Sequence, residues 1–144
     1  MSSTTIRKLR RVSDGVRDTG YFLVPPQNWL DTVEKKKGKR VLYFTLRTES
    51  YALVLSPMFE GPKVEAPRNS SPEIVALMLK QGSLICKLRE VRRGSHVYRI
   101  VNVPRVWVRA KEKEVNRKVV ALSLTAEPES ILVEPIFSGK PMSR

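Results

Sequence analysis

The chain has little of what most catalytic and cofactor sites are built from. Its 144 residues include one cysteine, Cys86, and one histidine, His96. A single cysteine excludes an internal disulfide framework and is compatible with a reducing cytosol. One histidine and one cysteine do not make a zinc site, and the sequence has neither a nucleophile–base signature nor a Gly-rich phosphate loop. We therefore expect neither an enzyme nor a metal or cofactor site.

Long apolar runs and acidic residues are scarce too. No run of about 20 apolar residues could span a bilayer, and the opening MSSTTIRKLRR lacks the apolar region of a signal peptide. The sequence therefore predicts a cytoplasmic protein without membrane contact. Against 14 Asp and Glu stand 27 Lys and Arg, which gives a formal charge of +13. The excess is +5 over residues 1–61 and +7 over residues 85–144, so it is not one basic tail. This distribution favours a polyanionic partner such as nucleic acid, and charge that merely aids solubility is the alternative.

The feature that organises the chain is an internal repeat. Residues 20–61 align without a gap with residues 98–139 at a constant offset of 78, and ten of the aligned positions are identical. An upstream segment, IRKLRRV at 6–12, matches ICKLREV at 85–91 at an offset of 79. The chain is thus two copies of a unit of about 55 residues, and each copy tests an interpretation of the other.

The repeat predicts the domain organisation. We expect repeat 1 over residues 1–61, a Pro-rich linker with a short helix over 62–84, and repeat 2 over 85–144. A unit this short buries little apolar surface by itself, so two copies that share one core are favoured. Two separate beads joined by residues 62–84 are the alternative.

Both repeats predict the element order β-β-α-β-β. In repeat 1, strands are expected over residues 6–12, 21–24, 41–46 and 53–59, with a helix over 26–36, and repeat 2 has their counterparts.

Particular residues mark the ends and faces of these elements. Prolines suit the first turn of the helix, and Gly or Asn suits the left-handed residue that closes it. Alternating apolar residues predict the strand face that points into the core, and a tryptophan on a short amphipathic helix predicts core packing. The residues concerned are Pro26 and Pro104, Gly38 and Asn116, Trp29 and Trp107, and the strand residues Leu42, Phe44, Leu46, Val120, Leu122 and Leu124.

With this order of elements the chain resembles the swapped-hairpin AbrB/SpoVT/MazE family. The resemblance rests on a basic first strand, a Gly-containing turn, a strand that ends in Val-Pro, a short helix with an N-W-L or R-V-W stretch, and a final hairpin that ends in Leu-x-Leu-x-Pro. It covers about residues 5–61 and 84–139. It implies a mainly β fold with short helices, in which two units interleave their hairpins into one small β-barrel. Here a single chain supplies both units as a tandem pseudo-dimer, and the resemblance implies binding to double-stranded DNA.

In this family the DNA-facing surface comes from the first strand, the loop after it and the start of the helix. The resemblance carries this role onto cations that are mostly arginine, the residue best suited to bidentate contacts with phosphates and guanine edges. The implied nucleic-acid-binding residues are Arg7, Lys8, Arg10, Arg11, Arg17, Lys87, Arg89, Arg92, Arg93, Arg99, Arg105 and Arg109. Repeat 2 departs from repeat 1 within this set, because Arg7 and Arg11 correspond to Cys86 and Glu90. An asymmetric operator is therefore predicted rather than a palindrome.

The resulting hypothesis is a DNA-binding transcriptional regulator. An antitoxin-like or scaffold protein with a protein partner, and an RNA-binding module, are the alternatives. The linker adds a separate prediction. Ser71 and Pro72 predict a helix start and Gly82 its end. A stripe on this helix that contains Ile74, Leu77 and Met78 is a candidate homo-oligomer contact, and packing as a simple connector is the alternative.

Overall fold

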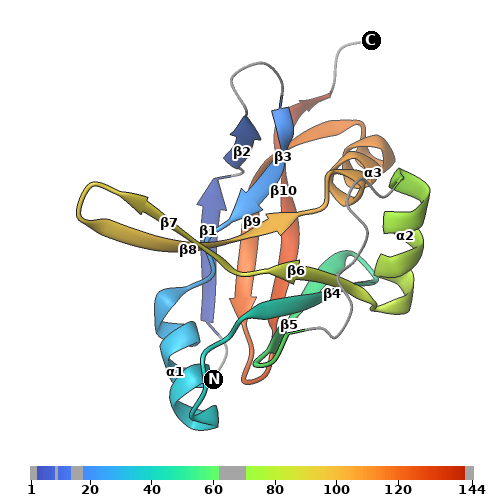
Figure 1. Ribbon diagram of the computed structural model, residues 1–144. Helices are drawn as coiled ribbons and strands as arrows, with labels where there is room; N and C mark the ends of the chain where they lie inside the picture. The colour runs from blue at the N-terminus through green and yellow to red at the C-terminus, as the bar shows by residue number, and fades with distance from the viewer. Residues whose placement is uncertain (1–2, 9, 14–17, 62–70, 142–144) are drawn as a thin grey trace.

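The computed structural model describes residues 3–8, 10–13, 18–61 and 71–141 (Figure 1). The described part is mainly β, with ten strands and three short helices. In chain order the elements are β1 (Ser3–Lys8), β2 (Arg10–Ser13), β3 (Asp18–Leu23), α1 (Gln27–Lys37), β4 (Tyr43–Glu49), β5 (Ala52–Met58), α2 (Pro72–Gln81), β6 (Leu84–Lys87), β7 (Arg89–Arg93), β8 (His96–Val103), α3 (Arg105–Val115), β9 (Arg117–Ala126) and β10 (Ile131–Pro141).

The strands form two antiparallel sheets to which both repeats contribute. The six-stranded sheet has the order β1-β9-β10-β5-β4-β6, and the four-stranded sheet has the order β2-β3-β8-β7. The first strand of each repeat pairs with the other repeat, β1 with β9 and β6 with β4. Both sheets are open among the described strands, because β1 and β6 are the edges of one and β2 and β7 of the other. The expected closed barrel is therefore replaced by two open sheets.

The strand registers reveal a pseudo-two-fold axis. Val54 of β5 pairs with Leu132 of β10, and Leu23 of β3 pairs with Val101 of β8. The two members of each pair differ by 78 in number, which is the repeat offset, so each residue meets its own counterpart there. The axis therefore passes through the middle of both sheets and relates repeat 1 to repeat 2.

One core serves both repeats. Phe44 and Leu46 of repeat 1 and Leu122 and Leu124 of repeat 2 are fully buried in the same cluster. Trp29 and Trp107 belong to the cluster as well, which confirms the prediction that the tryptophans are core residues. Residues from both copies thus share one interior, and the alternative of two separate beads does not hold.

The predicted first strand of each repeat is in fact two strands. Where one strand was expected over 85–91, β6 ends at Lys87 and β7 begins at Arg89. Leu88, at the break, is 7% exposed and donates its N–H to the carbonyl of Leu42 at 3.0 Å. Because β6 belongs to the six-stranded sheet and β7 to the four-stranded sheet, this buried leucine marks the bend between them. In repeat 1, β1 and β2 are likewise separate strands in the two sheets.

The inward face predicted for the next strand was wrong at one position in each repeat. Leu42 and Val120 are 43% and 48% exposed, although Phe44 and Leu122, two residues on, are fully buried. Leu42 precedes β4, which begins at Tyr43, so it is not yet part of the alternating strand. Val120 lies within β9 at a β-bulge, because Ala121 pairs with Ile136 and Val119 with Phe137, and the extra residue interrupts the alternation there.

The helix ends follow the predicted signals closely. Gly38 and Asn116 both take the left-handed conformation, at φ of 73° and 58°, and close α1 and α3. Pro26 and Pro104 act as N-caps rather than first-turn residues, and their carbonyls accept from Leu30 and Val108. These matched ends set α1 and α3 at corresponding places in the two repeats.

The linker helix α2 begins and ends as predicted, at an N-cap Ser71 whose hydroxyl accepts from the N–H of Ile74 and at a left-handed Gly82. Its inner face carries Leu79, which is 2% exposed, and the half-buried Val75 packs against the same core. Ile74 and Leu77 remain exposed, so the helix attaches through one face and leaves an apolar stripe on the other.

Candidate nucleic-acid interface

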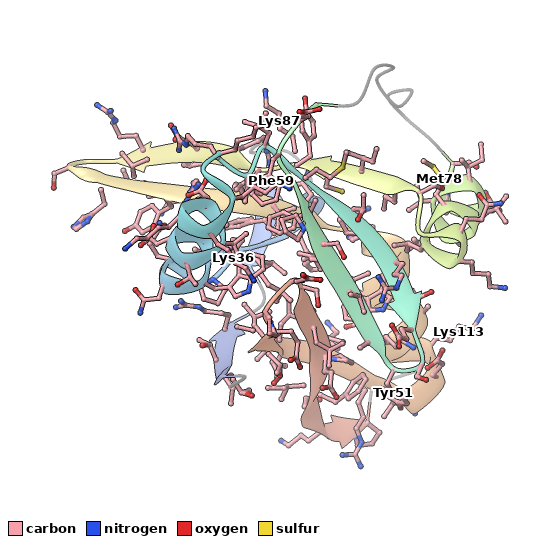
Figure 2. The ribbon with its side chains drawn as sticks, turned by 90° about the horizontal axis from the view of Figure 1, so that it is seen from below. Lys36, Tyr51, Phe59, Met78, Lys87 and Lys113 are labelled. Atoms are coloured by element: carbon pink, nitrogen blue, oxygen red, sulfur yellow. The ribbon has the colours of Figure 1, made fainter. Side chains whose placement is uncertain are left out.

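The β7–β8 hairpin forms a two-stranded ribbon that projects from the body in both views (Figures 1 and 2). The two strands pair from Arg89 with Ile100 to Arg93 with His96, and Gly94 turns the chain at a positive φ of 61°. Pairing of β8 with β3 covers only residues 101–103. The outer ribbon therefore has no further strand beside it in the described structure.

The ribbon carries exposed arginines on both of its faces. Arg89 and Arg93 lie on one face of β7 and Arg92 lies on the other. All three side chains are exposed. Arg89 donates from Nη2 to the Oδ1 atom of Asn102 at 2.8 Å, which fixes its direction. The only acid within residues 89–103 is Glu90, and it already binds Arg40 at 2.8 Å. The ribbon is therefore a concentrated positive surface.

Arg99 does not belong to that surface. It is 8% exposed and forms two hydrogen bonds with Glu34 of α1, Nη1 to Oε2 at 2.8 Å and Nη2 to Oε1 at 3.0 Å. Arg99 in this position holds the pKa of the Glu34 carboxyl below its ordinary value of 4.5 against the opposing effect of burial. The assignment of Arg99 to DNA binding is therefore corrected, because its donors are spent on a bond between the two repeats.

Arg7 and Lys87 come from the edge strands of the six-stranded sheet. Both side chains are exposed. Lys87, on β6, leads into the ribbon and is labelled in Figure 2. Arg7, on β1, lines a pocket together with Arg93 of the ribbon. The structure thus brings Arg7, Lys87, Arg89, Arg92 and Arg93 to the two edge strands and the hairpin that continues from one of them.

Arg105 and Arg109 lie elsewhere. They belong to α3, where they line a groove with Pro72 and Val75 of α2. β8 connects the ribbon to α3, and its eight residues span roughly 25 Å at a rise of about 3.3 Å per residue. Arg105 is half-buried and Arg109 exposed. These two arginines are therefore distant from Arg93 at the outer end of the ribbon, whereas Arg89, at its base, binds Asn102, three residues before Arg105.

The remaining predicted residues are in repeat 1. The backbones of Lys8, Arg10 and Arg11 lie in β1 and β2, but their side chains are outside what the structure describes. Arg17 lies outside the described residues altogether. The sequence places Lys8 and Arg10 at the positions that correspond to Lys87 and Arg89, so both repeats carry this pair of cations.

Sequence reasoning missed the partners of these arginines. Arg89 is oriented by a hydrogen bond to Asn102. Arg40 is neutralised by Glu90, and Arg99 by Glu34. The one available signal was Arg99 itself, a charged residue within the apolar run that corresponds to Tyr21-Phe22-Leu23-Val24. A cation in a buried strand requires a carboxylate partner, and Glu34 and Glu112 are among the identical positions of the repeat.

Comparison with protein-family models, with curated proteins and with solved structures gave no significant match. No helix in the described part of the chain is long and apolar enough to cross a membrane. Among the same residues, no group of three or more His, Cys, Asp and Glu side chains is arranged to hold a metal ion.

Proposed function

We propose that this chain is a transcriptional regulator that binds duplex DNA through its arginine-rich edge strands and ribbon. The observation that carries the proposal is the β7–β8 ribbon, which has exposed arginines on both faces and no free carboxylate. The major groove of B-DNA is about 12 Å wide and admits a two-stranded β-ribbon. A ribbon in that groove would direct Arg92 toward one wall and Arg89 and Arg93 toward the other.

We also propose that the fold is a variant of the swapped-hairpin arrangement of the AbrB/SpoVT/MazE family. Two features support this. The first strand of each repeat pairs with the other repeat, and a pseudo-two-fold axis relates the repeats. One chain would then supply the two related surfaces that a homodimer normally supplies.

The two surfaces differ chemically, which supports an asymmetric operator. Arg11 corresponds to Glu90, which is neutralised by Arg40, and Arg7 corresponds to Cys86. Burial raises the pKa of the Cys86 thiol to about 11, so this position offers no charge near pH 7. The two half-sites would therefore meet guanidinium groups at different strand positions. Footprinting that returned a perfect inverted repeat would contradict this.

A salt titration tests the proposal. Six to eight neutralised phosphates predict that the logarithm of duplex affinity falls with the logarithm of salt concentration at a slope of roughly −5 to −7. Arg92→Ser installs the residue that repeat 1 carries at the corresponding Ser13, and it should make the slope shallower by about 1. The matched control is Lys113→Gln, which removes an exposed cation from α3, away from the ribbon (Figure 2). Its slope should equal that of the parent.

Two results would contradict the proposal. One is a duplex affinity that does not change with salt concentration, and the other is a salt slope that Arg92→Ser and Lys113→Gln alter equally. Structured RNA is the competitor in the same assay. If RNA displaced duplex DNA at equal concentration, the RNA-binding alternative would be favoured.

A homo-oligomer through α2 stays a prediction. Ile74 and Leu77 are 51% and 54% exposed, whereas Met78 is half-buried and lies on α2 as Figure 2 shows. Replacement of both exposed residues by lysine should reduce the solution mass to that of one chain if this stripe forms the contact.

A further inference from the structure

A pocket of about 220 Å³ opens between the edge strand β1 and the ribbon. Its lining includes Arg7 of β1, Phe22 of β3, Val91 and Arg93 of β7, and Tyr98 and Ile100 of β8. Pockets for drug-sized ligands reach about 300–1,000 Å³. This one is smaller, so it suits a single planar ring system rather than a large ligand.

Register explains how an arginine comes to line this pocket. Arg7 pairs with Leu122, which is fully buried, so the two residues share the inner face of the six-stranded sheet. Because β1 is an edge strand, the Arg7 side chain stays exposed while it takes an inward position. Its counterpart Cys86 pairs with Phe44 and packs against the core. The other copy therefore fills the same inward position with a small apolar group.

The ribbon supplies the second wall. Val91 pairs with Tyr98 and Arg93 with His96, so Val91, Arg93 and Tyr98 lie on one face of the ribbon. Ile100 is on that face too and is 7% exposed, whereas Tyr98 is 41% exposed. The pocket thus has an apolar floor and an accessible aromatic ring at its side.

The chemistry of the lining points to an anionic ligand with a planar ring. Among the residues whose side chains the structure describes, no carboxylate lines the pocket, and neither Arg7 nor Arg93 forms an ion pair. Two guanidinium groups with open donors suit a phosphate, which accepts bidentate bonds. The rings of Phe22 and Tyr98 suit stacking with a base, as in proteins that bind single strands.

The duplication provides an internal control for these residues. In the aligned repeats, Arg7 corresponds to Cys86, Arg93 to Asp14 and Tyr98 to Gly20. For Arg7 and Tyr98, the other copy forms the corresponding strand position with Cys86 in β6 and Gly20 in β3, without a cation or a ring. The strands therefore do not require Arg7 or Tyr98, and these two residues together with Arg93 supply the charge and an aromatic surface of the pocket.

We infer that this pocket binds one nucleotide, with the base against Tyr98 and Phe22 and the phosphate between Arg7 and Arg93. If the nucleotide belongs to DNA, it would be an unpaired nucleotide beside the duplex, and in that case the inference rests on the proposed function. A free nucleotide carries the same chemistry, and the experiment distinguishes the two sources.

The test compares three probes on the full chain. These are a fully paired duplex, the same duplex with one unpaired adenine nucleotide, and free dAMP. A bound unpaired nucleotide should raise the affinity of the second duplex over the first by roughly 5- to 150-fold, the effect of stacking one base. Tyr98→Val should bring the ratio of the two affinities to about one, and Tyr98→Phe should retain the preference. Arg7→Cys, which installs the residue of the other copy, should also reduce the ratio.

Arg92→Ser is the matched control, because Arg92 lies on the opposite face of β7 and does not line the pocket. It should weaken binding to both duplexes equally and leave their ratio unchanged. Binding of dAMP that Tyr98→Val abolishes, without a preference between duplexes, would support the pocket and assign it to a free nucleotide.

A wild-type ratio of one together with no binding of dAMP overturns the inference. If the paired duplex still binds with the expected salt slope, the proposed function survives that result. If neither duplex binds, the proposed function fails separately. Circular dichroism of each variant verifies that the chain remains folded, and Tyr98→Phe keeps the test valid should Tyr98→Val unfold it.

Discussion

The ion pair between Glu34 and Arg99 joins the two repeats, and its removal offers a quantitative test of the shared core. The Arg99 side chain is 9% exposed and that of Glu34 is 17% exposed. Glu34→Gln therefore strands the more deeply buried ion of the pair. Loss of one partner of a buried pair costs about 3–5 kcal/mol. Glu34 is partly solvated, so we expect the lower end, a loss of about 3 kcal/mol in the free energy of unfolding.

Denaturation by urea, followed by circular dichroism, measures that loss, and in a thermal melt it corresponds to a fall of roughly 10 °C for a chain of this size. The double variant Glu34→Gln with Arg99→Met should recover most of the stability, because an apolar side chain of similar volume often replaces a buried ion pair without loss. Glu112→Gln is the matched control. Glu112 likewise accepts the N–H of Val119 at 3.0 Å, but position 21, which corresponds to Arg99, is a tyrosine. The amide oxygen of glutamine can still accept that N–H, so this variant should lose less than about 1 kcal/mol.

The pH dependence of the difference follows from the lowered pKa of Glu34. A carboxyl whose pKa is lower in the folded state than in the unfolded state stabilises the fold above its ordinary pKa, here 4.5. That contribution is lost as the pH falls through the lower folded value. The difference between the parent and Glu34→Gln should thus be constant from about pH 7 to pH 5 and shrink below the ordinary pKa. A loss under about 1 kcal/mol at pH 7, or a difference that does not change on acidification, would refute this account.

Three further predictions concern single residues. Phe44→Ala should lower the free energy of unfolding in urea by about 3–5 kcal/mol because Phe44 is fully buried. Leu42 is 43% exposed, so Leu42→Ala should lower it by less than about 1 kcal/mol. Equal losses would contradict the assigned faces. Gly38 has a φ of 73° and open space where a Cβ would lie, so Gly38→Ala should lower the free energy of unfolding by about 1 kcal/mol through backbone strain alone. Gly38→Asn, which copies Asn116, should lower it less. The reverse order of melting temperatures would count against the left-handed cap. Burial raises the pKa of the Cys86 thiol from an ordinary 9.0 to about 11, and the thiolate is the reactive form. A thiol reagent at pH 8 should therefore react about 100-fold more slowly with the native chain than with the chain unfolded in urea. Rates within tenfold of each other would be inconsistent with a buried thiol.

Local features of this fold could be predicted from the sequence because they depend on neighbouring residues. Gly38 and Asn116 occupy the same position in both copies and close the helices as expected. Ser71 and Pro72 begin α2 for similarly local reasons, the hydroxyl that accepts from Ile74 and the fixed φ of proline. In these cases the duplicated sequence or the capping chemistry removes most of the ambiguity.

Strand partners could not be predicted in the same way. Alternation along a strand identifies its faces but does not identify the strand beside it, so the pairing of β1 with β9 is absent from the pattern. The bend at Leu88 left a weak signal, an apolar residue between Lys87 and Arg89, but the same spacing also fits one continuous strand. The pocket combines residues from β1, β3, β7 and β8, and so it depends on those same long-range pairings.

Fusion of two repeats in one chain allows the residues of the buried pair and of the pocket to differ between the two sides of the axis. In a homodimer, a substitution such as Tyr to Arg at the position of Arg99 would appear on both sides of the axis. In this chain it appears only in repeat 2, where it binds Glu34, and repeat 1 keeps Tyr21. Arg7, Arg93 and Tyr98 follow the same logic, because each has a chemically different counterpart. The identical residues are largely those that the shared core and helix packing require, such as Trp29 and Trp107. Because Arg99 also diverges and binds Glu34, divergence alone does not identify a binding residue; under the proposed function, the exposed divergent residues of the ribbon and the pocket are the ones to mutate.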